Sequence, residues 1–176
     1  SVSISGFGFH TVASRNVITF NNGAVGVVTA ATATSLTVTF SIRPAAAGTL
    51  TASVTSNGIS GSSAVSIAVV NPIVTTNTTA RLAANASSLT ITGSGFSTTA
   101  GNNTVVFNNG AVGTVTAATA TTLTVNLTTA PTSAGSLTAI VTTNGRSSGA
   151  AVQIATVFPV VTSSVSSLLA DATTLT

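Results

Sequence analysis

Residues 107–113 read Phe-Asn-Asn-Gly-Ala-Val-Gly, and the same seven residues stand at positions 20–26. The two copies are 87 residues apart, and at the same distance Ile4-Ser-Gly-Phe-Gly-Phe9 returns as Ile91-Thr-Gly-Ser-Gly-Phe96. A period of this length is too long for one turn of a solenoid, but it suits a whole immunoglobulin-like domain of roughly 100 residues. The sequence therefore predicts domains in tandem.

Short segments of alternating apolar and polar residues fill each copy, as in Leu36-Thr-Val-Thr-Phe40 and Leu50-Thr-Ala-Ser-Val54. A period of two is typical of a half-buried β-strand. Asn-Gly pairs at Asn22 and Asn57, and in the second copy, indicate type I′ hairpin turns, which need positive φ at both central residues. We expect an all-β fold, with about seven short strands per copy in two packed antiparallel sheets.

The alternation also predicts which side chains form the core. Truncating a buried aromatic ring to alanine lowers the free energy of unfolding by about 3–5 kcal/mol. We expect this loss for Phe107→Ala if the ring of Phe107 is buried. The expected core residues of the first copy, each with a counterpart 87 residues later, are Ile4, Phe9, Phe20, Val28, Leu36, Val38, Leu50, Val54 and Ile67.

Charged side chains are nearly absent. They make up 3% of the residues, and Asp171 is the single side-chain carboxylate. One carboxylate cannot supply an acid/base pair or a calcium site, and the chain has no Cys and one imidazole, His10. We therefore expect no enzyme activity, no cofactor and no metal. The four Arg are scattered, which argues against nucleic-acid binding. No apolar run approaches the ~18 residues of a membrane helix, so we expect no membrane insertion.

Three motifs follow one another in the second copy: Leu89-Thr-Ile-Thr-Gly-Ser-Gly-Phe96, Val105-Val-Phe-Asn-Asn-Gly110 and Gly135-Ser-Leu-Thr-Ala-Ile-Val141. This order resembles an IPT/TIG domain, and the resemblance covers both copies. It implies an immunoglobulin-like fold. Members of that family occur as tandem stalks in bacterial surface proteins and adhesins, and as accessory modules of carbohydrate-active enzymes. Other members are transcription factors and receptors, whose DNA-contacting basic loops have no match here. We expect an extracellular or cell-surface location.

The domain boundaries are out of phase with the ends of the sequence. We expect a first repeat over residues 1–71 that lacks its own first strand, and a second over 72–158. Residues 159–176 match the first strand of a third repeat. Two explanations stay open: the sequence is a window on a longer periodic chain, or each subunit donates its tail to complete the next subunit.

Low charge favours assembly, because charged side chains are a usual means of keeping β-sheet edges apart. We expect a structural repeat of an extracellular filament or adhesin stalk, which assembles head to tail with copies of itself into a stiff rod. The alternative is a carbohydrate- or ligand-binding module, or an accessory module of a larger secreted protein. The expected assembly residues are Pro159, Val160, Val161, Leu169 and Leu175. Candidate glycosylation sites, and so surface glycans, are indicated by the sequons at Asn77, Asn85, Asn102 and Asn126.

Overall fold

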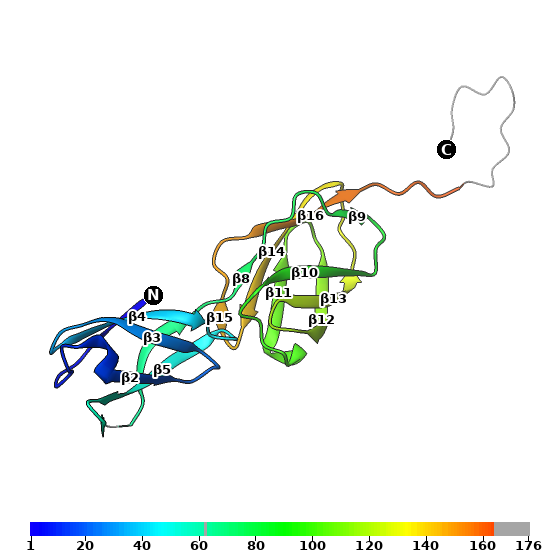
Figure 1. Ribbon diagram of the computed structural model, residues 1–176. Coiled ribbons are helices and arrows are strands. Elements are labelled where there is room, and N and C mark those ends of the chain that lie inside the picture. Colours follow the sequence, from blue (N-terminus) through cyan, green and yellow to red (C-terminus); the bar gives the residue numbers. More distant parts are fainter. Residues whose placement is uncertain (62, 164–176) are drawn as a thin grey trace, which may run out of the picture.

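Alternating apolar and polar residues form short strands throughout the computed structural model, which describes residues 1–61 and 63–163. The strands build two β-sandwiches, one from each repeat, and the two lie end to end (Figure 1). The expected all-β, immunoglobulin-like fold is confirmed.

The first sandwich packs two antiparallel sheets, which keep the order β1-β4-β3 and the order β2-β5-β6, with β7 also bonded to β5. A short 3-10 turn, η1 (Ala13–Arg15), precedes β2. The strands are β1 (Val2–Ser5), β2 (Asn16–Phe20), β3 (Val25–Ala31), β4 (Ser35–Ile42), β5 (Gly48–Ser56), β6 (Ile59–Ser60) and β7 (Val65–Val70).

The second sandwich has the sheet orders β12-β13-β10-β8 and β11-β14-β16-β9, with β15 bonded to β14. The segment that the sequence indicated as one first strand is split here. Its β8 part joins one sheet, whereas its β9 part joins the other and runs parallel to β16. The elements are β8 (Ile73–Val74), β9 (Arg81–Ala83), β10 (Ser88–Ser94), η2 (Ala100–Asn102), β11 (Asn103–Phe107), β12 (Val112–Ala118), β13 (Thr122–Thr129), β14 (Gly135–Thr143), β15 (Arg146–Ser147) and β16 (Val152–Phe158).

The Asn-Gly turns have the expected conformation but not always the expected place. Asn57 and Gly58 both have positive φ, 49° and 83°, and they close the β5–β6 hairpin. Asn22 and Gly23 also have positive φ, 55° and 66°, yet they connect β2 in one sheet to β3 in the other. The hairpin expected there is wrong, because a tight turn carries the chain between sheets as readily as between neighbouring strands.

The two cores differ in how completely they are closed. Leu36 and Val38 of the first repeat are fully buried, as their counterparts in the second repeat are. Phe96 is also fully buried, whereas the equivalent Phe9 is only partly buried. Phe107 is half-buried, because it lies at the end of β11 and packs against the core from its rim. Phe107 thus faces the core as expected, but its ring is not fully buried, so the cost of about 3–5 kcal/mol given for a buried ring does not apply.

Candidate functional site: the junction and the open groove

The junction between the sandwiches is short. Strand β7 ends at Val70 and β8 begins at Ile73, so that Asn71 and Pro72 form the whole linker. Proline fixes its own φ and pushes the preceding residue towards extended geometry. Pro72 is also fully buried. This linker leaves the chain few ways to bend between the two repeats.

Ala47, in the loop before β5, holds the two repeats together from the other side. Its N–H donates to the carbonyl of Gly95 at 2.7 Å, and its own carbonyl accepts from Nδ2 of Asn144 at 2.9 Å. Ala47 is 3% exposed as a result. Gly95 has φ of +78°, and the position of a Cβ there would lie 3.4 Å from Cα of Pro72. The junction is thus a packed contact with one backbone–backbone hydrogen bond and one hydrogen bond from a side-chain amide.

A buried asparagine shapes the loop that presents Gly95. Nδ2 of Asn103 donates to the carbonyls of Ser97 and Thr99 at 2.8 and 3.0 Å, and its Oδ1 accepts from Ser97 N–H and Thr143 Oγ1. All four hydrogen-bonding positions of this amide are therefore satisfied inside the protein. Asn16 makes the corresponding contacts in the first repeat, which means that both repeats present this loop in the same way.

The residues on each side of the junction have counterparts 87 residues away, at the two outer ends of the structure. Ala134 and Pro159 stand 87 residues after Ala47 and Pro72, and both are exposed. At the end of the first repeat that lies away from the junction, Gly8 corresponds to Gly95; it is exposed and has φ of +76°. The residues that form the internal junction are therefore present, without a partner repeat among the described residues, at both ends.

An open groove marks the first repeat. Within residues 1–61 and 63–163, β1 is bonded only to β4 and β7 only to β5, whereas the equivalent β10 and β16 have neighbours on both sides. The two unpaired edges belong to opposite sheets. Between them lies a groove of about 240 Å³, lined by Ile4, Ser5, Gly6, Phe7, Phe9, Ala52, Ser53, Val54, Gly61, Ser63 and Val65.

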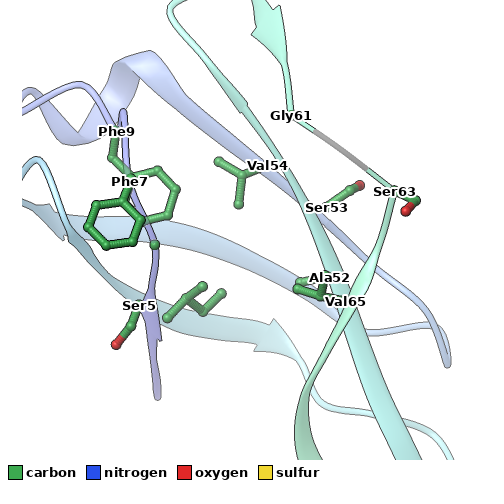
Figure 2. A pocket seen from close by; sticks show the side chains of 11 residues that line it. Ser5, Phe7, Phe9, Ala52, Ser53, Val54, Gly61, Ser63 and Val65 are labelled. Carbon is green, nitrogen blue, oxygen red and sulfur yellow. The ribbon is translucent and has the colours of Figure 1, made fainter.

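Figure 2 shows how the side chains surround this groove. Phe7 and Phe9 lie on one side and Ala52 and Val65 on the other, with Val54 between them. Apolar groups thus predominate, and the ring of Phe7 is 90% exposed. A groove of this character between two free strand edges is suited to an extended peptide, whose backbone would pair while its side chains fill the groove.

In the second repeat, the chain fills the equivalent place with its own residues 72–84. Val74 of β8 and Leu82 of β9 are buried members of that core. Arg81 adds a cation–π contact, because its Cζ lies 3.5 Å from the ring centroid of Phe158. Segment 72–84 therefore supplies core side chains and backbone bonds that the first repeat lacks in the described residues.

The residues expected to act in assembly are only partly described. Val161 is 94% exposed, and Pro159 and Val160 are exposed as well; the segment leads away from the second sandwich in Figure 1. Leu169 and Leu175 lie outside the described residues.

Three of the sequon asparagines, Asn85, Asn102 and Asn126, are exposed. Asn77 is half-buried, and its Oδ1 accepts hydrogen bonds from Thr79 and from Ala80 N–H. The first three thus offer the more open side chains to a glycosylating enzyme.

Side chains that could bind a metal ion or take part in catalysis are few in the described ranges. They contain no group of three or more His, Cys, Asp or Glu that could hold a metal ion. His10 acts locally, since its Nδ1 accepts the N–H of Val12 at 3.0 Å. Across residues 1–61 and 63–163, every helix falls short of the length and apolar character needed to cross a membrane.

The junction residues Ala47, Gly95 and Asn103 were not identified from the sequence. Ala47 and Gly95 lie far apart along the chain and meet only when both sandwiches have formed. Asn103 carried a usable signal, because Asn16 is its counterpart, but repetition alone does not separate a buried asparagine from an exposed one.

Comparison with known proteins gives one family match. The family model of the IPT/TIG domain matches residues 72–167. Among solved structures, domains 5–6 of the S-layer protein SbsC are 15% identical, covering 85% of this chain and 83% of that one with a TM-score of 0.36. An endo-fucoidan hydrolase of glycoside hydrolase family 107 is 14% identical, covering 84% of this chain and 24% of that one with a TM-score of 0.31. No curated protein matches the chain.

Proposed function

Because the chain belongs to the IPT/TIG domain family, we propose that its repeats are non-catalytic structural modules of an extracellular filament or adhesin stalk. In this role they follow one another head to tail and form a stiff rod. The observation that carries the proposal is the junction, with its two-residue linker, its buried Pro72 and the two hydrogen bonds of Ala47. Such a linker resists bending far more than a flexible Gly/Ser linker does.

The surface properties of the chain support the same role. With 3% charged residues, the chain has little of the electrostatic repulsion that keeps soluble β-proteins apart. Exposed sequons at Asn85, Asn102 and Asn126 would allow glycans to supply solubility in a glycosylating host. We place the protein outside the cell or on its surface, with further copies of the same repeat as its partner.

Small-angle X-ray scattering of the 176-residue chain, extrapolated to zero concentration, tests the stiffness. We expect the curve to fit one fixed arrangement of the two repeats. A control variant carries a short Gly/Ser insertion between Asn71 and Pro72, and its curve should require an ensemble of arrangements. If the wild-type chain needs the same broad ensemble as the insertion variant, the rod is refuted.

A ligand-binding role is the second candidate, and one observation favours it. The exposed ring of Phe7 stands beside an apolar groove, and sugars commonly stack on such rings. The second repeat has Ser94 at this position, so a binding site would belong to the first repeat alone. Binding to a glycan array that disappears in Phe7→Ala would support this role, and a blank array would count against it.

A further inference from the structure

We propose that the open groove of the first repeat accepts residues 159–161 of a second copy of this chain as an added strand, so that each copy completes the sandwich of the next. The proposal rests on the head-to-tail arrangement proposed above and adds the contact that joins separate copies. The second repeat provides the template, because β8 pairs with β10 there in the equivalent place.

The template defines the register of the added strand. Val74 lies opposite Gly93 in the antiparallel β8–β10 pair. Shifted by the repeat length, Val161 of the incoming strand lies opposite Gly6 of the first repeat. Val74 is buried in the core that it completes, whereas Val161 is 94% exposed among the described residues. Strand addition would therefore bury an apolar side chain that now faces solvent.

The ends of the molecule fit the same geometry. In the internal junction, the strand that fills the groove follows directly after the linker, and Ala47 bonds to Gly95 beside it. The corresponding residues between copies are Ala134 of the donor and Gly8 of the acceptor, and both are exposed. One docking movement would thus form the junction and fill the groove together, as a heterologous contact that repeats along a fibre.

Substitutions at two neighbouring positions distinguish strand addition from nonspecific hydrophobic association. Val161→Asp would place a charge in the core of the acceptor, and we expect assembly to weaken by at least about a hundredfold. Val160→Asp is the matched control, because its counterpart Ile73 faces solvent in the template. It should assemble within a few-fold of wild type. Analytical ultracentrifugation of the full chains measures both, and circular dichroism checks that each variant folds. Equal behaviour of the two variants would overturn the proposal.

Gly6→Ala tests the acceptor side. In the open groove, a Cβ at Gly6 would lie 2.5 Å from Cζ of Phe9, the far end of a side chain that is only partly buried. At the equivalent Gly93, which has its strand in place, a Cβ would collide with the carbonyl oxygen of Ile73, a backbone atom. The alanine should therefore leave the isolated chain folded but block the added strand. A Gly6→Ala chain that assembles like wild type would contradict the proposed register.

Cysteine trapping reports the register directly, since the chain has no Cys of its own. The template pairs Ile73 with Ser94, which makes Val160 and Phe7 the corresponding pair between copies. Chains carrying Phe7→Cys and Val160→Cys should form a mixed disulfide when combined and oxidised. An Ile73→Cys/Ser94→Cys chain is the positive control. Exposed Val106→Cys, combined with Val160→Cys, is the negative control, and equal yields there would overturn the proposal.

A strand from the same polypeptide is the other candidate to fill the groove. A fused chain distinguishes this case from donation between copies. We would fuse a copy of residues 72–87 in front of Ser1, so that the first repeat fills its own groove. We expect this fused chain to stay monomeric while the wild-type chain assembles. A wild-type chain that stays monomeric at every concentration rules out donation between copies. The stiffness seen by scattering still decides the rod separately, so the two proposals can fail independently.

Discussion

Phe96 and Phe9 hold equivalent places in the two repeats but differ in burial, and this difference yields a quantitative prediction. Phe96 is 0% exposed, in the core that includes Val74 of β8. Phe9 is only partly buried, since no described segment covers the first repeat at that point. Truncating a fully buried Phe costs about 3–5 kcal/mol, so Phe96→Ala should lower the free energy of unfolding of the second repeat by about 4 kcal/mol. Phe9→Ala should cost the first repeat about half as much.

Urea unfolding followed by far-ultraviolet circular dichroism suits this chain, because it contains no Trp or Tyr for fluorescence. Two folded repeats need not unfold in one step, so the curves are fitted with separate transitions. Each substitution should move the transition of its own repeat. Phe7→Ala is the control from the same loop and should change neither, because the ring is exposed. At a concentration where the chain is monomeric, equal losses for Phe9→Ala and Phe96→Ala would refute the idea that the first sandwich is open.

Further substitutions probe the loops and strand edges of the second repeat. Asn103→Ala should destabilise this repeat by about 2–4 kcal/mol, since its buried partners lose their hydrogen bonds. The control is Asn102→Ala at the exposed neighbouring position, which should change stability by no more than about 0.5 kcal/mol. Thermal melts of the two variants compare them. Gly93→Ala should cost more than about 3 kcal/mol, because its Cβ would collide with a backbone oxygen of β8; a small shift in urea midpoint would contradict this. Phe107→Ala should cost only about 1–2 kcal/mol, below the range for a fully buried ring, and a larger loss by calorimetry would mean that the ring is better packed than its exposure indicates.

Much of the architecture could be predicted from local patterns. The 87-residue repeat predicted tandem domains. Alternating apolar and polar residues, as in Leu36-Thr-Val-Thr-Phe40, indicated strands with one buried face. Leu36 and Val38 were correctly assigned to the core for this reason. The positive φ of Asn57 and Gly58 was also foreseeable, because a type I′ turn requires it whatever surrounds the turn.

Long-range partners decided the rest, and local sequence does not encode them. The same Asn-Gly pair closes a hairpin at Asn57 but connects two sheets at Asn22, because the pairing of the following strand determines the outcome. Phe9 and Phe96 stand in similar sequences, yet only Phe96 is fully buried within the described residues. Ala47 became a junction residue only through contact with the next repeat. Sequence thus determined the sandwich and its period, whereas the tertiary structure determined which edges are paired, because pairing depends on what lies across each edge.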